Sequence, residues 1–434
     1  MADLSFVRKD IIPQRAAPIS ETGIIGWFRK NMFSDIPNTI LTIILAYFII
    51  SVLANILPWV FSPTWNSVSL TECRGILAEL GRSGHGGGGA CWGVIRERWL
   101  QLLFGFYPSE LYWRPILAFI LLGLALAPVL FDKASRKLLY LTAIYPFLCF
   151  WLIWGGSIWF PLTVFSGFIV SYLGYVYVTK LSGSLAGVIA SIALPVIWWL
   201  FISSPLSAFL HTIIPLGSEA IESDRLGGFM LAILIGVTGI ALSLPIGILL
   251  ALGRQSNLPI LKAVCVCFIE FIRGVPLITL LFVASTLLNI FLPPGSNFDL
   301  ILRVMIMVTL FAAAYMAEVV RGGLAALPKG QYEAADSLGL DYWKAQRLII
   351  MPQALKISIP GIVSTFIGLF KDTTLVSIIG LLDPLGLSTN IRADMAWNGI
   401  LWELYGFVGL IFFIFCFSMS RYSMYLERKL ATGH

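Results

Sequence analysis

Long apolar runs recur along almost the whole chain, and they limit its possible fold more than any other feature. Many reach about 20 residues, the length that an α-helix needs to cross a hydrocarbon layer of roughly 30 Å. Of the 434 residues, 58% are hydrophobic and 12% are charged, whereas a soluble domain carries roughly 25% charged residues. The mean hydropathy is +0.88. Because the runs are continuous rather than alternating, a membrane β-barrel is excluded, and we predict an all-α polytopic membrane protein.

The apolar runs predict about ten transmembrane helices. Their expected positions are 38–60, 114–131, 138–157, 161–179, 182–203, 227–252, 260–292, 299–318, 357–381 and 399–420. The run 260–292 is long for one span and contains Pro276, which predicts a tilt or a break. The spans divide the chain into an N-terminal half, 1–225, with a large loop at 61–113, and a C-terminal half, 226–434. Each half contains five expected spans.

Lys and Arg residues are distributed unevenly between the two sides of this arrangement. An even number of spans places both termini on one side, and twenty Lys and Arg residues fall on that side, against eight on the other. Because basic loops are retained in the cytoplasm, we expect both termini and the loop 331–352 to be cytoplasmic, and the loop 61–113 to be external. The net charge of +6 is explained by this topology and does not indicate nucleic acid binding.

The cysteines and histidines do not indicate a metal site. Cys73 and Cys91 both lie in the loop 61–113, in a compartment that permits a disulfide; a disulfide and two unpaired thiols both remain open. Cys265 and Cys267 are too close for a CxxC pair, and the three His residues are scattered. The run GRSGHGGGGACWG lacks the Lys-Ser/Thr ending of a phosphate-binding loop, so we expect a flexible loop there.

The segment 331–352, QYEAADSLGLDYWKAQRLIIMP, is a polar interruption between two apolar runs of the C-terminal half. Gly339 predicts the end of a short helix over 331–338. Asp341 predicts the N-cap of a second helix, which is expected to end near Pro352. The segment therefore predicts a helix–turn–helix projection on the cytoplasmic side.

The composition of this projection is typical of a docking surface. Glu333 is expected in the first turn of its helix, where the helix dipole favours an anion. Ala334 and Ala335 have little side-chain bulk, so the surface of a partner can approach the backbone, and Tyr342 and Trp343 supply aromatic area. An ordinary solvated loop is the alternative, but it would need neither the alanine pair nor fixed caps.

The same segment resembles the coupling motif of ABC importer permeases. The matching positions are Glu333, Ala334, Ala335, Gly339, Ile349, Met351 and Pro352, with Met351 where the family usually has Leu. EFIRGVPLITLLF, AAYMAEVVRGGLAALPKGQYEAA and LFKDTTLVSIIG resemble the polar amino acid branch of these permeases. ACWGVIRERWLQLLFGFYPSELYWRP resembles the general L-amino acid permease family, in its M subunit. The resemblance implies a five-helix permease core over 226–434, with a long N-terminal extension before it.

The resemblance implies a permease subunit of an ATP-driven importer of L-amino acids, with broad specificity, in the inner membrane of a Gram-negative bacterium. The chain contains no GxxxxGK[S/T] sequence, so it is not expected to hydrolyse ATP itself. No His/Asp/Glu cluster, nucleophile motif or metal-ligand set indicates an enzyme, and no cofactor is expected in this chain. ATP and Mg²⁺ are expected on a separate cytoplasmic ATPase, whose groove receives the coupling helices.

The implied partners are two ATPase copies, a homologous second permease and a periplasmic amino acid-binding protein. The second permease follows from counting, because the ATPase pair of this family has two grooves and this chain has one coupling segment. A homodimer would also satisfy the count. The stretch VIRERWLQLLFGF is the expected contact for the binding protein, with a helix lying on the membrane surface as the alternative.

Charged residues at membrane depth are costly and are therefore candidates for the substrate path. Lys371 and Asp372 lie within an expected span, followed by Thr373 and Thr374, which could offer hydroxyls to an amino acid. Glu318, near the end of its span, is a further candidate. The alternative is a structural pair that holds helices together.

Glu270 and Arg273 lie at the expected cytoplasmic edge of the membrane, and with Pro276 they are candidates for a gate or a bend. Simple packing, or an arginine whose head reaches the interface, is the alternative. A different class of function, an ion-coupled secondary amino acid transporter, would predict inverted repeats and paired broken helices. The sequence shows neither feature.

Overall fold

The computed structural model describes residues 23–82, 88–287, 290 and 299–430. The two terminal segments, which were predicted to be cytoplasmic, and the centre of the glycine-rich run, which was predicted to be a flexible loop, lie outside the described residues. The chain forms two compact units, Met1–Gly93 and Val94–His434.

The first unit is helical in its described part. Its helices are α1 (Gly23–Asn31), α2 (Ile36–Val60) and α3 (Leu70–Glu79). The carboxylate of Asp35 accepts the Asn38 N–H at 2.8 Å and so begins α2. The hydroxyl of Ser69 accepts the Glu72 N–H at 3.2 Å and begins α3. Local capping by these side chains therefore sets where both helices begin.

A disulfide joins Cys73 on α3 to Cys91, with 5.8 Å between the two Cα atoms. The hydroxyls of Ser62 and Thr64 both donate to the Ala90 carbonyl oxygen, and all three residues are buried. The disulfide and these hydrogen bonds together fix the segment that follows α2.

The second unit contains all the remaining described elements. Its helices are α4 (Gly93–Phe104), η1 (Ser109–Leu111), α5 (Trp113–Leu130), α6 (Leu138–Trp154), α7 (Trp159–Ser182), α8 (Ser184–Ile197), η2 (Trp198–Ile202), α9 (Ser203–Ile213), η3 (Ser223–Arg225), α10 (Gly228–Gln255), α11 (Pro259–Gly274), α12 (Leu277–Phe282), η4 (Val283–Leu287), α14 (Leu300–Ala325), α15 (Lys329–Ser337), α16 (Tyr342–Ala345), η5 (Gln346–Ile350), α17 (Met351–Asp372), η6 (Thr373–Ile379), α18 (Pro384–Ala393) and α19 (Trp402–Leu430). Strands β1 (Gly156–Ser157) and β2 (Gly217–Ser218) pair antiparallel.

The prediction of an all-α polytopic membrane protein is confirmed. Eight described helices are long and apolar enough to cross a membrane, and the pair formed by α11 and α12–η4 makes a ninth if it is one span. The expected span 138–157 corresponds to α6, which is shorter than the others. The pair is bent by 102°. Pro276 lies directly before α12, and it has no N–H to donate to a continuing helix. It also disfavours helical backbone at the residue before it, so the helix breaks here.

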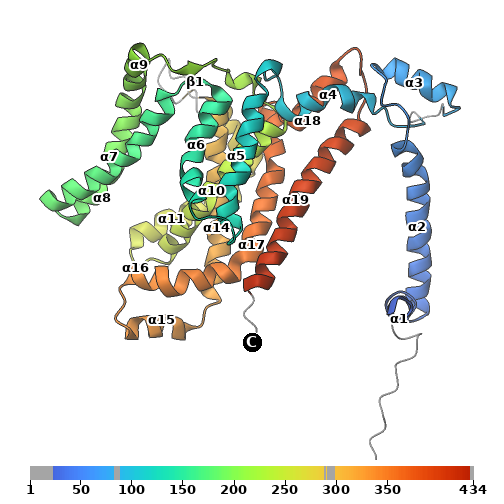
Figure 1. Cartoon of the computed structure of the whole chain (residues 1–434). Helices are drawn as coiled ribbons and strands as arrows, with labels where there is room; N and C mark the ends of the chain where they lie inside the picture. The colour runs from blue at the N-terminus through green and yellow to red at the C-terminus, as the bar shows by residue number, and fades with distance from the viewer. Residues whose placement is uncertain (1–22, 83–87, 288–289, 291–298, 431–434) are drawn as a thin grey trace, which may run out of the picture. The chain divides into compact units, whose positions relative to one another are not determined.

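Helices α10 and α14 form the centre of the second unit and pack along each other. In the apolar part of α14, 56% of the residues are buried, compared with 11% in the apolar part of α8–α9. Helices α7 and α8 pack on each other and project to the side of the unit (Figure 1). Figure 1 also shows α15 and α16 at one end of this unit and α4 and α18 at the opposite end.

Candidate functional site

The projection between α14 and α17 is built around Gly339. This residue has a φ of +66°, a left-handed conformation that favours glycine, and a Cβ added there would meet no atom within 4 Å. The Gly339 N–H donates to the Asp336 carbonyl at 2.9 Å, and the Leu340 N–H donates to the Ala335 carbonyl at 3.3 Å. These bonds satisfy carbonyls at the end of α15 and turn the chain sharply toward α16.

Asp341 begins α16. Its carboxylate accepts the Lys344 backbone N–H at 3.0 Å and forms an ion pair with the Lys344 ammonium at 2.9 Å. The hydrogen bond from the Lys344 side chain is the main cause that lowers the pKa of Asp341 below its usual value. The carboxylate therefore stays ionised, as a cap at a helix N-terminus requires.

Two expectations for the first helix were wrong. Because α15 begins at Lys329, Glu333 lies in its second turn and not in the first, beyond the free amides of the helix start. Ala335 is 1% exposed and faces the protein interior, so only Ala334 of the alanine pair lies on the surface.

The second helix does not end near Pro352 as expected. Helical backbone continues from α16 through η5 and α17. The η5 segment is a π-helical turn, in which the Met351 N–H donates to the Gln346 carbonyl five residues earlier. Pro352, which has no N–H, follows as one of the first residues of α17, where its missing donor is tolerated.

Large apolar side chains are exposed on this projection. Leu338 is 71% exposed, Tyr342 53%, Trp343 66% and Leu348 63%. The rings of Tyr342 and Trp343 pack edge to face, with 5.3 Å between their centroids. Exposed apolar side chains of this kind are expected where either a partner protein or a membrane covers the surface.

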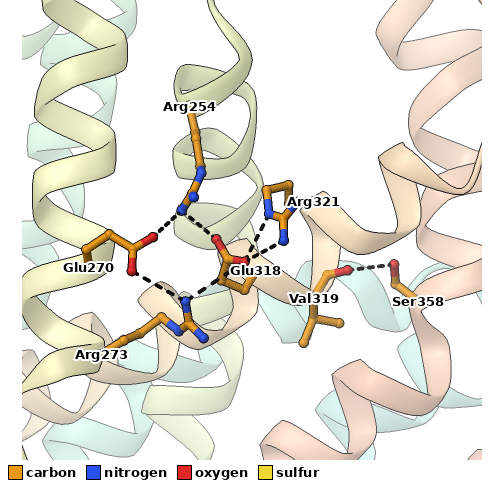
Figure 2. A network of polar contacts seen from close by, with 7 residues as sticks. All are labelled: Arg254, Glu270, Arg273, Glu318, Val319, Arg321 and Ser358. Atoms are coloured by element: carbon orange, nitrogen blue, oxygen red, sulfur yellow. Dashed lines mark hydrogen bonds and ion pairs between the residues drawn. The ribbon is translucent and has the colours of Figure 1, made fainter.

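Five charged side chains form a network near this end of the unit. Arg254 comes from α10, Glu270 and Arg273 come from α11, and Glu318 and Arg321 come from α14 (Figure 2). Nη1 of Arg254 lies 2.8 Å from Oε1 of Glu270 and 2.6 Å from Oε1 of Glu318. One guanidinium nitrogen therefore bridges carboxylates on two different helices.

Glu318 is the centre of this network. Its side chain is 16% exposed, and its second oxygen lies 2.9 Å from Arg321 and 3.9 Å from Arg273. The guanidinium of Arg273 also lies 5.6 Å from the centre of the Tyr315 ring. Three arginines around two carboxylates leave one net positive charge. Because the network is partly buried, dissolved salt screens these charges less than it screens exposed ones.

The structure brings together three residues that the sequence assigned to different roles. Glu318 was expected on the substrate path, whereas Glu270 and Arg273 were expected at a gate or bend. In the structure, the carboxylates of Glu270 and Glu318 and the guanidinium of Arg273 belong to one ion-pair network. Arg273 lies next to the bend between α11 and α12, since α11 ends at Gly274.

Arg254 and Arg321 were missed by the sequence interpretation. A signal was available for Arg321, because the pattern Glu-x-x-Arg-Gly occurs twice, at 270–274 and at 318–322. Each copy places a carboxylate and a guanidinium on the same face of one helix. Nothing in the sequence near Arg254 indicated that it would lie between the two copies.

The other expected substrate-path residues lie where α17 meets η6. Thr373 is fully buried and its hydroxyl donates to the Phe370 carbonyl at 2.8 Å. The Thr374 hydroxyl donates to the Lys371 carbonyl at 2.9 Å, and Asp372 is the residue before η6. Across the described residues, no hydrogen bond or ion pair joins this group to the arginine–glutamate network. The two polar sites are therefore separate.

At the opposite end of the unit, α4 packs on the segment that follows α18. Arg98 on α4 and Asp394 form an ion pair at 2.7 Å, with side chains 31% and 36% exposed. The indole N–H of Trp397, a fully buried residue, donates to Glu97 at 3.1 Å. The indole and the ion pair therefore contribute to holding the stretch expected to contact a binding protein on the core, together with the buried side chain of Phe104.

Asp383 fixes the start of α18. Its carboxylate is fully buried and accepts N–H groups from Leu385 at 3.2 Å and Gly386 at 2.9 Å. Burial raises the pKa of Asp383 from 3.8 to about 6, because the loss of water outweighs these two donors.

Metal-ligating side chains are dispersed through the described part of the chain. Nowhere in that part do three or more His, Cys, Asp and Glu side chains lie close enough together to hold a metal ion. Cys149, Cys265, Cys267 and Cys416 are free thiols.

Full-length similarity connects this chain to amino-acid transport proteins. The family described as "Binding-protein-dependent transport system inner membrane component" matches residues 243–432. The chain is 58% identical to "Glutamate/glutamine/aspartate/asparagine transport system permease protein BztC" of Rhodobacter capsulatus, over 100% of both chains. It is 39% identical to "Inner membrane amino-acid ABC transporter permease protein YhdY" of Escherichia coli, over 97% of each chain.

Shorter proteins match about half of the chain. "Probable glutamine ABC transporter permease protein GlnP" of Bacillus subtilis is 31% identical over 202 residues, which are 46% of this chain and 90% of the relative. Among solved structures, "Crystal structure of an amino acid ABC transporter with histidines" matches at 28% identity, with a TM-score of 0.42. That match covers 46% of this chain and 91% of the other.

Proposed function

Because this chain belongs to the permease family of amino-acid ABC transporters, we propose that it is a transmembrane subunit of an ATP-driven importer with broad L-amino acid specificity. A permease of this family is a non-enzymatic membrane component, so a separate ATPase supplies the hydrolysis and carries the ATP and Mg²⁺. The importer lies in the inner membrane of a Gram-negative bacterium, with the α15–α16 end in the cytoplasm.

The turn from α15 through Gly339 to α16 is the observation that carries this proposal. Glu333 and Ala334 are exposed there, beside the apolar side chains of Leu338 and Trp343. A groove on the ATPase would cover this apolar surface and accept the acidic side chain. The projection then transmits the opening and closing of the ATPase to α14 and α17, which it connects.

The substrate path is proposed to pass the junction of α17 and η6. The Rhodobacter capsulatus relative is named for the transport of glutamate, glutamine, aspartate and asparagine, and these amino acids are suitable substrates to test here. Asp372, which is partly exposed, is placed to meet the ammonium group of an amino acid. Asp372→Asn should then reduce uptake without preventing assembly with the ATPase; loss of assembly alone would indicate a structural role.

Four kinds of subunit are proposed for the complete importer. Two ATPase copies need two coupling projections, and this chain has one, so a second, homologous permease supplies the other. A periplasmic amino acid-binding protein docks at the end that carries α4. The mass of the intact complex tests this composition, and an active complex with two copies of this chain and no second permease would contradict the heterodimer.

The C-terminal part, 226–434, is proposed to be the permease core, with 1–225 as an N-terminal extension. The family match at 243–432 and the half-length relatives support this division. The extension then belongs to the longer relatives alone, and the coupling projection lies within the core.

The coupling role is tested by a matched pair of substitutions. Gly339→Val forces a β-branched residue into a left-handed conformation, at a cost of about 1–2 kcal/mol, and should distort the projection. Gly123→Val on α5 introduces the same side chain into equally open space on a helical backbone. Recovery of the ATPase with the purified chain, and ATP-dependent uptake, should fall only for Gly339→Val. Full ATPase binding and uptake after replacement of residues 333–339 by a glycine–serine linker would contradict the proposal.

A further inference from the structure

Two of the contacts in the arginine–glutamate network lie within single helices. Arg273 and Glu270 are three residues apart on α11, and Arg321 and Glu318 are three residues apart on α14. Arg254, on α10, is the residue that contacts both carboxylates at hydrogen-bond distance. We propose that Arg254 is a positioning residue that makes α10, α11 and α14 move as one body with the coupling projection, an inference that rests on the proposed coupling to an ATPase.

Apolar packing connects the network to the coupling projection. Leu327, in the short link between α14 and α15, is 8% exposed and belongs to the same buried cluster as Ile269 on α11 and Val320 on α14. Tyr332 on α15 packs against this cluster. Because close-packed interiors transmit displacement instead of absorbing it, a movement of α15 reaches α11 and α14 at the level of the network.

The other end of α11 leads toward the proposed substrate path. After the bend, α12 contributes Leu277 and Leu281 to the central buried cluster, which also contains Leu369 of α17 and Val376 of η6. Helix α12 contacts η6 directly. A displacement of α11 is therefore passed through α12 to the segment that carries the proposed path residues.

The position of Arg254 is fixed by the close approach of α10 to α11. A Cβ added at the neighbouring Gly253 would collide with the sulfur of Cys265. This contact holds the end of α10 near enough for one guanidinium nitrogen to reach Glu270 and Glu318 together.

Removal of Arg254 would break the charged link from α10 to α11 and α14 without leaving an unpaired carboxylate. Arg273 would still lie 3.9 Å from both Glu270 and Glu318. Glu318 would also keep Arg321 at 2.9 Å. If Arg254 only stabilised the fold, its removal would reduce assembly and thermal stability. If Arg254 transmits movement, its removal would reduce the number of amino acids carried for each ATP hydrolysed.

The test uses the complete complex, with its ATPase, second permease and binding protein, in lipid vesicles. Uptake of radiolabelled L-glutamate and L-glutamine is measured together with ATP hydrolysis. Arg254→Gln should assemble normally and hydrolyse ATP, but its uptake per ATP should fall at least about fivefold, the lower end of the usual range for coupling between two sites. Arg254→Lys should restore most of the ratio, because an ammonium can still donate to both carboxylates.

Arg321→Gln is the matched comparison, because it removes an arginine from the same network but breaks a contact within one helix. Its uptake per ATP should fall less than that of Arg254→Gln. An unchanged ratio in Arg254→Gln would overturn the inference, and so would a failure of this variant to assemble or an equal loss in Arg321→Gln. A wild-type complex that shows no ATP-dependent uptake of either amino acid would instead count against the proposed function.

Discussion

The second unit holds its two ends together by different means. Near α15 and α16, the Glu318 side chain is 16% exposed and its carboxylate contacts arginines from three helices. At the opposite end, the Arg98–Asp394 ion pair has side chains about one-third exposed, beside the fully buried Trp397. The first end therefore combines a partly buried charge network with the apolar cluster around Leu327, whereas water weakens the more exposed ion pair at the second end.

The largest effect is expected from Glu318→Gln at the first end. The substitution leaves three arginines around one carboxylate. Removal of one member of a fully buried ion pair costs about 3–5 kcal/mol, and because the Glu318 side chain is 16% exposed, we expect a cost near the lower end of this range. We expect a corresponding fall in the free energy of unfolding, measured by thermal unfolding of the purified protein in detergent.

Glu270→Gln is the control for this substitution, since it removes a carboxylate of the same network whose side chain is 52% exposed. Its cost should be about 1 kcal/mol or less. Equal losses of unfolding free energy from the two substitutions would show that burial does not set the strength of this network. The proposed difference between the two ends of the unit would then be wrong.

A smaller, pH-dependent effect is expected from Asp383, at the second end. Its pKa is raised from 3.8 to about 6 in the folded protein, so between these values the folded state holds a proton that the unfolded state has lost. The free energy of unfolding therefore falls as the pH rises through this window, by roughly 3 kcal/mol once the pH is well above 6.

Asp383→Asn removes this titration but keeps an oxygen that can accept the Leu385 and Gly386 N–H groups. The variant should gain stability relative to the wild type as the pH rises from about 4 to about 8. Thermal unfolding of both proteins across this range measures the difference. A constant difference would mean that Asp383 titrates in the folded protein as it does in water.

The smallest effect is expected from Arg98→Gln. A partly exposed ion pair contributes about 0–1 kcal/mol, so the unfolding midpoint should shift only slightly. If this substitution destabilised the protein as much as Glu318→Gln, the ion pair and not Trp397 would hold α4 in place.

Much of the fold followed from the sequence because its strongest signals are local. Each expected span corresponds to a helix or a helix pair, since an apolar run long enough to cross a membrane must satisfy its backbone hydrogen bonds within itself. Gly339 and Asp341 likewise act on their immediate neighbours, and the structure has a turn and a cap at these positions.

The sequence misled where several local rules compete or where a distant contact decides. A proline normally ends a helix because it has no N–H to donate. Here a π-helical turn precedes Pro352, so the helix continues past this residue. Ala335 was expected on the surface because its small side chain would let a partner approach the backbone. The packing of α15 on the core instead buries it.

The sequence by itself determined that this chain is a helical membrane protein with one polar projection, because hydrophobicity, turn residues and caps act over a few neighbouring positions. Only the tertiary structure decided which charges meet. Arg254 lies 16 residues from Glu270 and 64 residues from Glu318 along the chain, so no local pattern joins them. Their contact depends on the packing of α10, α11 and α14, which brings three separate helices to one place.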